Sequence, residues 1–123
     1  MSVAQPLSPT DSTTDHMRVI AAAAELAEPF RQVVPTSRLW YGEPQTPFDI
    51  TLSTSQFPAG FGWDMTITRQ EWGRTAMSMC SLSHAPGSAD VDATWGTEAG
   101  PYLTSLEYTL RTLAVKQRGQ GAA

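Results

Sequence analysis

The sequence predicts a two-layer α+β domain, in which an antiparallel sheet of three to four strands is flanked by an N-terminal and a C-terminal helix in the order α-β-β-β-β-α. Between residues 48 and 95, apolar residues tend to recur at every second position, as they do in half-buried strands. In residues 15–30 and 101–118 they recur every three or four positions, which indicates helices with one buried side. We expect both helices to pack on the same face of the sheet.

The length of 123 residues suits one domain with a single hydrophobic core, which we expect to comprise residues 15–118. Residues 1–14 are rich in Pro, Ser and Thr, a composition typical of disorder, so they are expected to form a disordered N-terminal tail. Residues 119–123 are expected to be a frayed C-terminal tail.

The N-terminal helix is expected to begin near Asp15, because an acidic residue suits the positive end of a helix and three residues able to cap a helix precede it. Its buried side is marked by four apolar residues at spacings of four, three and four: Val19, Ala23, Leu26 and Phe30. Pro29 should end or kink this helix, since proline lacks the backbone N–H and disfavours a helical residue before it.

Four segments are expected to be strands: residues 48–54, 63–70, 75–83 and 91–95. In the first two, apolar residues alternate with Asp, Thr and Ser, so one face of each strand is buried and the other is polar. The third is less regular, because Met77 and Met79 occupy one phase of the alternation while Cys80 and Leu82 occupy the other. Apolar residues on both faces predict an interior strand, or one that a helix covers.

Three connecting segments also have expected roles. The apolar residues 39–41 are expected to form a patch at the entrance to the sheet. Residues 71–73 read as a tight hairpin turn, in which Gly73 can adopt a positive φ. The glycines at positions 60 and 62 should let the chain turn and bring Phe57 and Phe61 onto the core.

The C-terminal helix has the clearest signals. Pro101 suits the first position of a helix, where its missing N–H donor costs nothing. The apolar residues that share the buried side are Tyr102, Leu103, Leu106, Leu110, Leu113 and Ala114. Basic residues near the other end complement the negative end of the helix dipole: Arg111, Lys116 and Arg118.

Composition narrows the setting in which the protein acts. No apolar run approaches the roughly 20 residues that a membrane-spanning helix needs, and the N-terminus lacks the pattern of a signal peptide. A single cysteine, Cys80, excludes an internal disulfide and fits a reducing compartment, so we expect a cytoplasmic protein that does not contact membranes. Few lysines beside many Ala, Arg and Thr residues suggest a bacterial or phage origin.

Charge is distributed unevenly along the chain, whose formal net charge is −4. Residues 43–107 contain eight acidic residues and only two basic ones, Arg69 and Arg74, whereas the last sixteen residues contain three basic residues and no acid. An acidic sheet is a poor match for nucleic acid, because affinity for nucleic acid depends on neutralising phosphates. The acidic segment suits a protein partner with a basic surface, or serves only to keep the surface solvated.

The sequence contains no strong catalytic, cofactor or metal pattern. Cys80 and His84 could form a thiol and base pair, but a spacing of four across a strand and a loop does not define a geometry, and a lone buried cysteine usually packs. Asp90 and Asp92 beside His84 lack the spacing of known metal motifs. His16 is expected to face solvent. We therefore expect a protein that is not an enzyme and has no cofactor.

The best candidate for a binding residue is Trp72, at the tip of the expected hairpin beside Glu71 and between Arg69 and Arg74. Exposed tryptophan with nearby arginine is typical of protein-interface hot spots, although the ring could instead fold back over the sheet. Two acidic residues of the strands, Asp49 and Asp64, complete the predicted protein-binding site.

We therefore expect a small non-catalytic protein-binding module, acting as an accessory, immunity or inhibitor protein that occludes a basic surface of a larger partner. The alternative is a nucleic-acid-binding domain that uses the basic residues Arg111, Lys116 and Arg118 together with exposed aromatic residues. The aromatic residues that could stack on bases are Trp40, Tyr41 and Phe61. A homo-oligomer is a further expectation, because an edge strand rich in Ser and Thr lacks the residues that usually prevent edge pairing.

Overall fold

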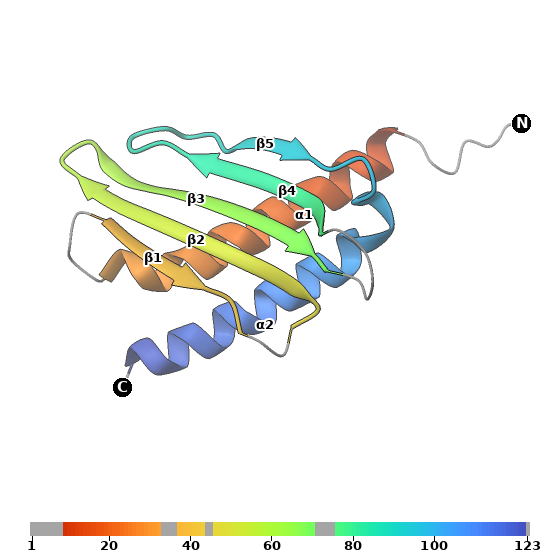
Figure 1. The fold of residues 1–123 in the computed structure, drawn as a ribbon. Helices are drawn as coiled ribbons and strands as arrows, with labels where there is room; N and C mark the ends of the chain where they lie inside the picture. Colours follow the sequence, from red (N-terminus) through yellow and green to blue (C-terminus); the bar gives the residue numbers. More distant parts are fainter. Residues whose placement is uncertain (1–8, 33–36, 44–45, 71–75, 123) are drawn as a thin grey trace, which may run out of the picture.

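The computed structural model describes residues 9–32, 37–43, 46–70 and 76–122. These residues form an antiparallel sheet of five strands, in the spatial order β1-β2-β3-β4-β5, and two long helices that lie behind it in Figure 1. The strands are β1 (Ser37–Tyr41), β2 (Phe48–Phe57), β3 (Gly60–Arg69), β4 (Met77–His84) and β5 (Asp92–Trp95). The helices are α1 (Pro9–Ala27) and α2 (Leu103–Ala122). The expected two-layer α+β class is therefore confirmed.

The expected count of three to four strands is too low, because the residues 39–41 belong to a fifth strand, β1. This strand is hard to recognise, since three apolar residues stand in a row although only one of them faces the core. Trp40 packs towards the helices with its ring 5.7 Å from that of Phe30, whereas Leu39 and Tyr41 remain exposed. Burial alternates along β1, but hydrophobicity does not.

Helix α1 ends and helix α2 begins close to the expected boundaries, but both helices extend into segments that were expected to be tails. Helix α1 begins at Pro9, six residues before the expected start near Asp15, and proline is well tolerated in the first turn of a helix. It ends at Ala27, where the 3₁₀ helix η1 (Glu28–Gln32) follows, as Pro29 predicts. Helix α2 follows the 3₁₀ turn η2 (Gly100–Tyr102), which contains Pro101. It continues to Ala122, so residues 119–122 are helical where a frayed tail was expected. Within the described residues, neither helix contains a stretch long and apolar enough to cross a bilayer.

The hydrophobic core lies between the sheet and the two helices. Every apolar residue expected on the buried sides of the helices faces this core, with Tyr102 at its margin. Helix α1, which packs beside α2, contributes three small and fully buried residues to this core: Ala22, Ala23 and Ala27. The sheet contributes larger side chains, all nearly inaccessible to solvent: Phe48, Ile50, Leu52, Trp63, Met65, Ile67 and Leu82.

A β-bulge in β4 explains the irregular pattern of this strand. Ile67 of β3 is paired with Cys80, but the next residue of β3, Thr68, is paired with Ser78, so Met79 is an extra residue in β4. The bulge turns both Met79 and Cys80 towards the core, where they are fully buried. The apolar residues of the two phases therefore lie on one face, and the expectation of apolar residues on both faces is wrong. The prediction that this segment is an interior strand is confirmed, because β4 lies between β3 and β5.

Candidate functional site

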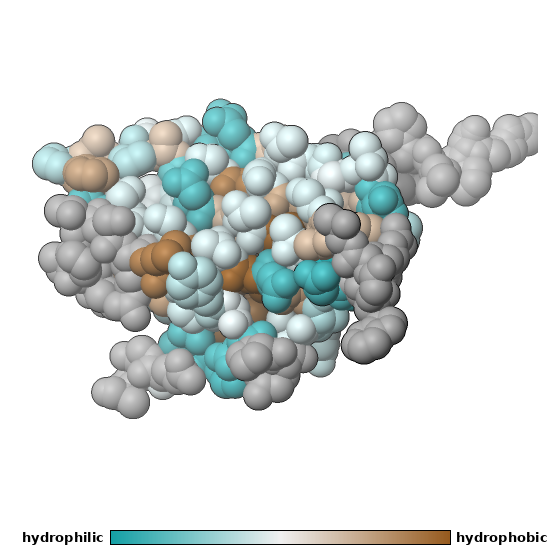
Figure 2. All heavy atoms as spheres, in the orientation of Figure 1, coloured by the Kyte–Doolittle hydropathy of each residue, from teal (hydrophilic) through white to brown (hydrophobic). Residues whose placement is uncertain are grey.

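The face of the sheet that points away from α1 and α2 has no described helix over it (Figure 1). We call it the open face. The register and the alternation of burial assign the following residues to it: Leu39, Tyr41, Asp49, Thr51, Ser53, Ser55, Phe57, Gly62, Asp64, Thr66, Thr68, Ser78, Ser81, Ser83, Asp92 and Thr94. Most of these side chains are short and polar, and Figure 2 shows this face as mainly pale and teal with few brown areas.

Hydroxyl groups follow one another across the whole sheet. The register aligns one row of residues over all five strands, each with a hydroxyl group: Tyr41, Thr51, Thr66, Ser81 and Thr94. Neighbouring members of such a row lie about 4.8 Å apart. In the adjacent row, the Ser83 hydroxyl donates a hydrogen bond of 2.7 Å to the Asp64 carboxylate, which orients that carboxylate on the surface. The result is a broad surface of short, regularly spaced donors and acceptors.

The charges on the open face have one sign. Its three carboxylates belong to Asp49, Asp64 and Asp92, all exposed, and among the residues whose side chains the structure describes it holds no Lys or Arg. Arg69 lies at the end of β3, but its side chain turns towards the helices, where the guanidinium lies 4.7 Å from the centre of the Tyr102 ring. The open face is therefore acidic and faces solvent.

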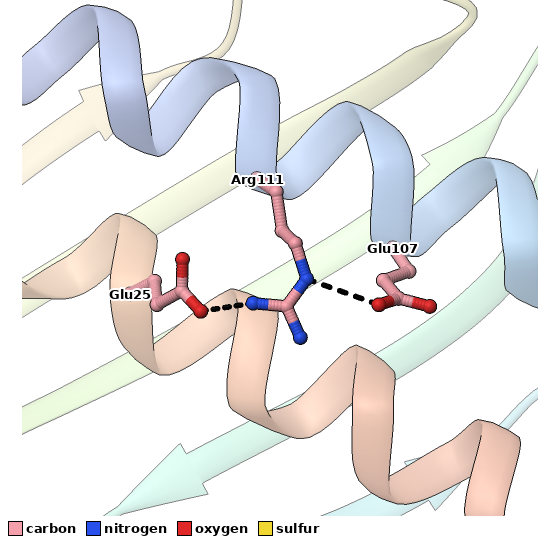
Figure 3. Close-up of polar contacts among 3 residues, drawn as sticks. All are labelled: Glu25, Glu107 and Arg111. Carbon is pink, nitrogen blue, oxygen red and sulfur yellow. Dashed lines mark hydrogen bonds and ion pairs between the residues drawn. The ribbon is translucent and has the colours of Figure 1, made fainter.

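The basic side chains lie mainly in the helical layer, where acidic partners accompany several of them. Arg31 pairs with Glu28 of the same 3₁₀ helix at 2.7 Å, and Lys116 of α2 lies 3.6 Å from the Glu43 carboxylate. Arg111 of α2 contacts Glu25 of α1 and lies 3.0 Å from Glu107 of its own helix (Figure 3). Its hydrogen bond to Glu107, followed by its contact with Glu25, raises the pKa of Arg111 above its ordinary value.

These ion pairs bear on the predicted nucleic-acid site. Arg111 and Lys116 already contact carboxylates, which reduces their positive potential at the surface, and Arg118 lies exposed near the end of α2. Trp40 and Phe61, two of the aromatic residues considered for base stacking, point towards the core side. The described residues therefore do not combine unpaired cations with an aromatic platform on one surface.

The structure brings together part of the predicted protein-binding site. Asp49 and Asp64 share the open face. Asp49 is paired with Thr68, which lies four residues beyond Asp64 on β3, so the two aspartates are about 13 Å apart along the strand direction. Arg69 lies on the opposite side of the sheet. Glu71, Trp72 and Arg74 lie outside the described residues.

Four open-face residues with an acidic or a large apolar side chain are absent from the predicted site. Asp92 is a third carboxylate on the open face, besides the two that were predicted. Its position in a strand with alternating apolar residues could have indicated that it lies on the polar face of the sheet. Leu39, Tyr41 and Phe57 are large apolar residues that are 49%, 67% and 49% exposed. The expectation that Phe57 faces the core is wrong, whereas Phe61 is buried as expected; the turn between β2 and β3 places the two rings on different faces.

The residues considered for catalysis and metal binding have other surroundings. Burial raises the pKa of the Cys80 thiol to about 12, so the thiol stays protonated at neutral pH and is a poor nucleophile. His84 lies four residues further along β4, where its Nε2 donates a 2.7 Å hydrogen bond to the Ser88 carbonyl. The described residues contain no group of three potential metal ligands.

His16 differs from its expected position in solvent. Its ring stacks on Trp95 of β5 with the centroids 4.3 Å apart, so it joins α1 to the edge of the sheet. Its role in the described structure is packing.

Comparison of the chain with protein-family models, with curated proteins and with solved structures gives no match. The geometry and chemistry of the open face therefore carry the functional proposal.

Proposed function

We propose that this protein is a non-catalytic binding module whose open face covers a basic surface of a larger protein partner. The observation that supports this proposal is a sheet face that no described helix covers, with three exposed carboxylates and no described Lys or Arg side chain. In this role it acts as an accessory, immunity or inhibitor protein, because covering a surface needs no reacting groups.

The side chains of the open face suit an interface for physical reasons. Ser, Thr and Asp side chains are short, so they lose little conformational freedom when a partner immobilises them. Each carboxylate can accept hydrogen bonds from an Arg or Lys of the partner. Such charge-assisted hydrogen bonds are stronger than those between neutral groups. The neighbouring hydroxyl groups can both donate and accept, so they can satisfy polar groups that the interface buries.

The exposed apolar residues add the second ingredient of an interface. Leu39, Tyr41 and Phe57 lie on β1 and β2, towards one side of the same face. Protein interfaces typically combine apolar and aromatic contacts with a polar, charged rim. The two kinds of residue on one face therefore favour a protein partner over a nucleic acid, which the carboxylates repel.

The proposal predicts that reversing the charge of the open face prevents capture of the partner. The double variant Asp64→Lys, Asp92→Lys keeps short-range packing intact, because both side chains are exposed, but should repel a basic surface. Tagged protein would be used to capture proteins from the source cell, with identification by mass spectrometry. The expected result is that the partner's yield falls at least tenfold relative to the unchanged protein.

The matched control changes the net charge equally on other surfaces. Glu28→Lys, Glu98→Lys alters two exposed acids away from the open face and should retain the partner. The captured complex should also weaken as the salt concentration rises from about 0.05 to about 0.5 M, because salt screens the attraction between exposed charges. An open-face variant that captures the same partner as well as the control does would overturn the proposal.

A further inference from the structure

Strand β1 forms one edge of the sheet, and its hydrogen-bonding pattern shows which of its backbone groups point outwards. The Gly42 N–H donates a 2.7 Å hydrogen bond to the Ile50 carbonyl, so these two residues form a hydrogen-bonded pair. In an antiparallel ladder such pairs alternate with pairs that make no hydrogen bond to each other. Trp40 is therefore hydrogen-bonded to β2, while the N–H and C=O groups of Leu39 and Tyr41 point away from β2.

The same two residues expose their side chains on the open face, at 49% for Leu39 and 67% for Tyr41. Backbone groups and apolar side chains are thus presented together along this edge. Within the described part of the chain, no strand pairs with the outer side of β1 (Figure 1). This combination is the one that strand-adding partners use: main-chain hydrogen bonds supply affinity, and alternate side chains supply specificity.

The other edge strand, β5, is less suited to this role. The Gly96 N–H donates to the Met79 carbonyl at 2.9 Å, so the outward-pointing backbone groups of β5 belong to Ala93 and Trp95. Trp95 faces the helical layer and lies under the His16 ring of α1. The outward-pointing backbone groups of β5 thus belong to residues whose side chains turn to the helical layer, whereas those of β1 belong to Leu39 and Tyr41, which are exposed on the open face.

We propose that an extended segment of the partner pairs antiparallel with the outer edge of β1 and becomes a sixth strand of the sheet. This inference rests on the proposed function and specifies how the partner engages the same face. The segment carries apolar residues opposite Leu39 and Tyr41, because those side chains are the exposed apolar ones on this edge. A basic residue comes two positions before the residue opposite Tyr41, since the next open-face residue on that side is Asp49 of β2.

A designed peptide provides the direct test. The peptide Thr-Lys-Thr-Val-Thr-Val-Thr, labelled with a fluorophore, places its valines opposite Tyr41 and Leu39 and its lysine on the Asp49 side when it binds antiparallel. Fluorescence anisotropy measures its Kd for the full-length protein. N-methylation of both valines blocks the hydrogen bonds to β1 and should weaken binding at least tenfold. N-methylation of the two threonines that flank the second valine leaves those bonds intact and should change Kd less than threefold.

A pair of protein variants tests the same edge from the other side. Leu39→Pro removes an N–H that the β1–β2 ladder does not use, and edge strands tolerate proline at such positions. Leu39→Ala removes the side chain but keeps the N–H. We expect Leu39→Pro to weaken the peptide at least tenfold and Leu39→Ala to weaken it less than fivefold, with circular dichroism confirming that both variants fold.

The outcomes separate this inference from the proposed function. If the unmodified peptide does not bind at 1 mM, or binds equally well with methylated valines, strand addition at β1 is overturned. If the cellular partner is lost with Asp64→Lys, Asp92→Lys but retained by folded Leu39→Pro, the proposed function stands and strand addition fails. If sizing shows a dimer that Leu39→Pro converts to a monomer, a second copy occupies this edge and the inference is likewise overturned.

Discussion

At the scale of single residues, Gly96 is the described glycine with the least room for a side chain. A Cβ atom at Gly96 would lie 1.8 Å from the Ser78 carbonyl oxygen, and the Gly96 N–H donates to the Met79 carbonyl. Only a residue without a side chain can therefore follow β5 so closely along the bulged part of β4. At Gly100, by contrast, a Cβ atom would meet nothing within 4 Å.

We predict that Gly96→Ala destabilises the protein by about 3 kcal/mol, because the backbone must move and strain a buried strand pairing. Urea unfolding followed by tryptophan fluorescence measures this change. Gly100→Ala is the matched control and should change the free energy of unfolding by less than about 0.5 kcal/mol. Equal stability of the two variants would contradict the close contact at Gly96.

Cys80 offers a second test at this scale, because burial raises its pKa to about 12. In the folded protein, iodoacetamide should alkylate Cys80 at least a hundredfold more slowly than in urea-unfolded protein at pH 8, as measured by mass spectrometry. The pKa of the thiol in the unfolded chain is about 8.5, well below its pKa in the folded protein. Between these two pH values the thiol is protonated in the folded protein and ionised in the unfolded chain, so unfolding releases a proton. Stability should therefore fall as pH rises from about 9 to 12, and Cys80→Ala should lack that part of the decline. Rapid alkylation of the folded protein would show that Cys80 is accessible.

At the scale of elements, α1 and α2 are joined by their packed side chains and by one ion-pair network. Arg111 lies between Glu25 of α1 and Glu107 of α2, and about two fifths of its side chain is exposed (Figure 3). Solvent weakens each of these contacts, but one guanidinium interacts with two carboxylates that would otherwise repel each other. Arg31 and Glu28, in contrast, form a pair within one short element.

We predict that Arg111→Met lowers the midpoint of thermal unfolding by a few degrees, because it leaves Glu25 and Glu107 facing each other without a cation. The control Arg31→Met removes a comparably exposed pair inside η1 and the charge that lies 4.5 Å from the centre of the Phe61 ring, which a methionine side chain can still cover. It should therefore have a smaller effect. Differential scanning calorimetry at low and high salt compares them, and the difference should shrink at 0.5 M salt. A larger effect of Arg31→Met would show that the ion-pair network of Arg111 does not stabilise the packing of α1 against α2.

At the scale of the whole molecule, the helical layer and the open face of the sheet carry different polar groups. The helical layer holds the described ion pairs, and the sheet turns its carboxylates and hydroxyl groups away from it. Two open faces would repel each other through Asp49, Asp64 and Asp92, so this arrangement favours a different, basic partner for the open face. The Asp64→Lys, Asp92→Lys experiment tests this division directly.

The layout of the layers follows from local patterns that the sequence carries. Residues such as Leu106 and Leu110 in α2, and Ile50 and Leu52 in β2, repeat with the periods of a helix and a strand, and the structure buries all four. Local periodicity was sufficient because each element only has to turn one apolar side to the core. The acidic character of the strands was likewise evident, so Asp49 and Asp64 could be assigned to one polar face.

What only the tertiary structure decided depends on pairing between distant segments. β1 is a strand because Trp40 meets both β2 and Phe30, and Met79 is a bulged residue because β3 and β4 differ by one residue in register. Neither the pairing of β1 with β2 nor the register between β3 and β4 can be predicted from the local sequence pattern. The sequence by itself determined the α+β class and a polar, acidic sheet face. Long-range packing decided that β1 forms one edge of the sheet, and that the backbone of Leu39 and Tyr41 points outwards at this edge.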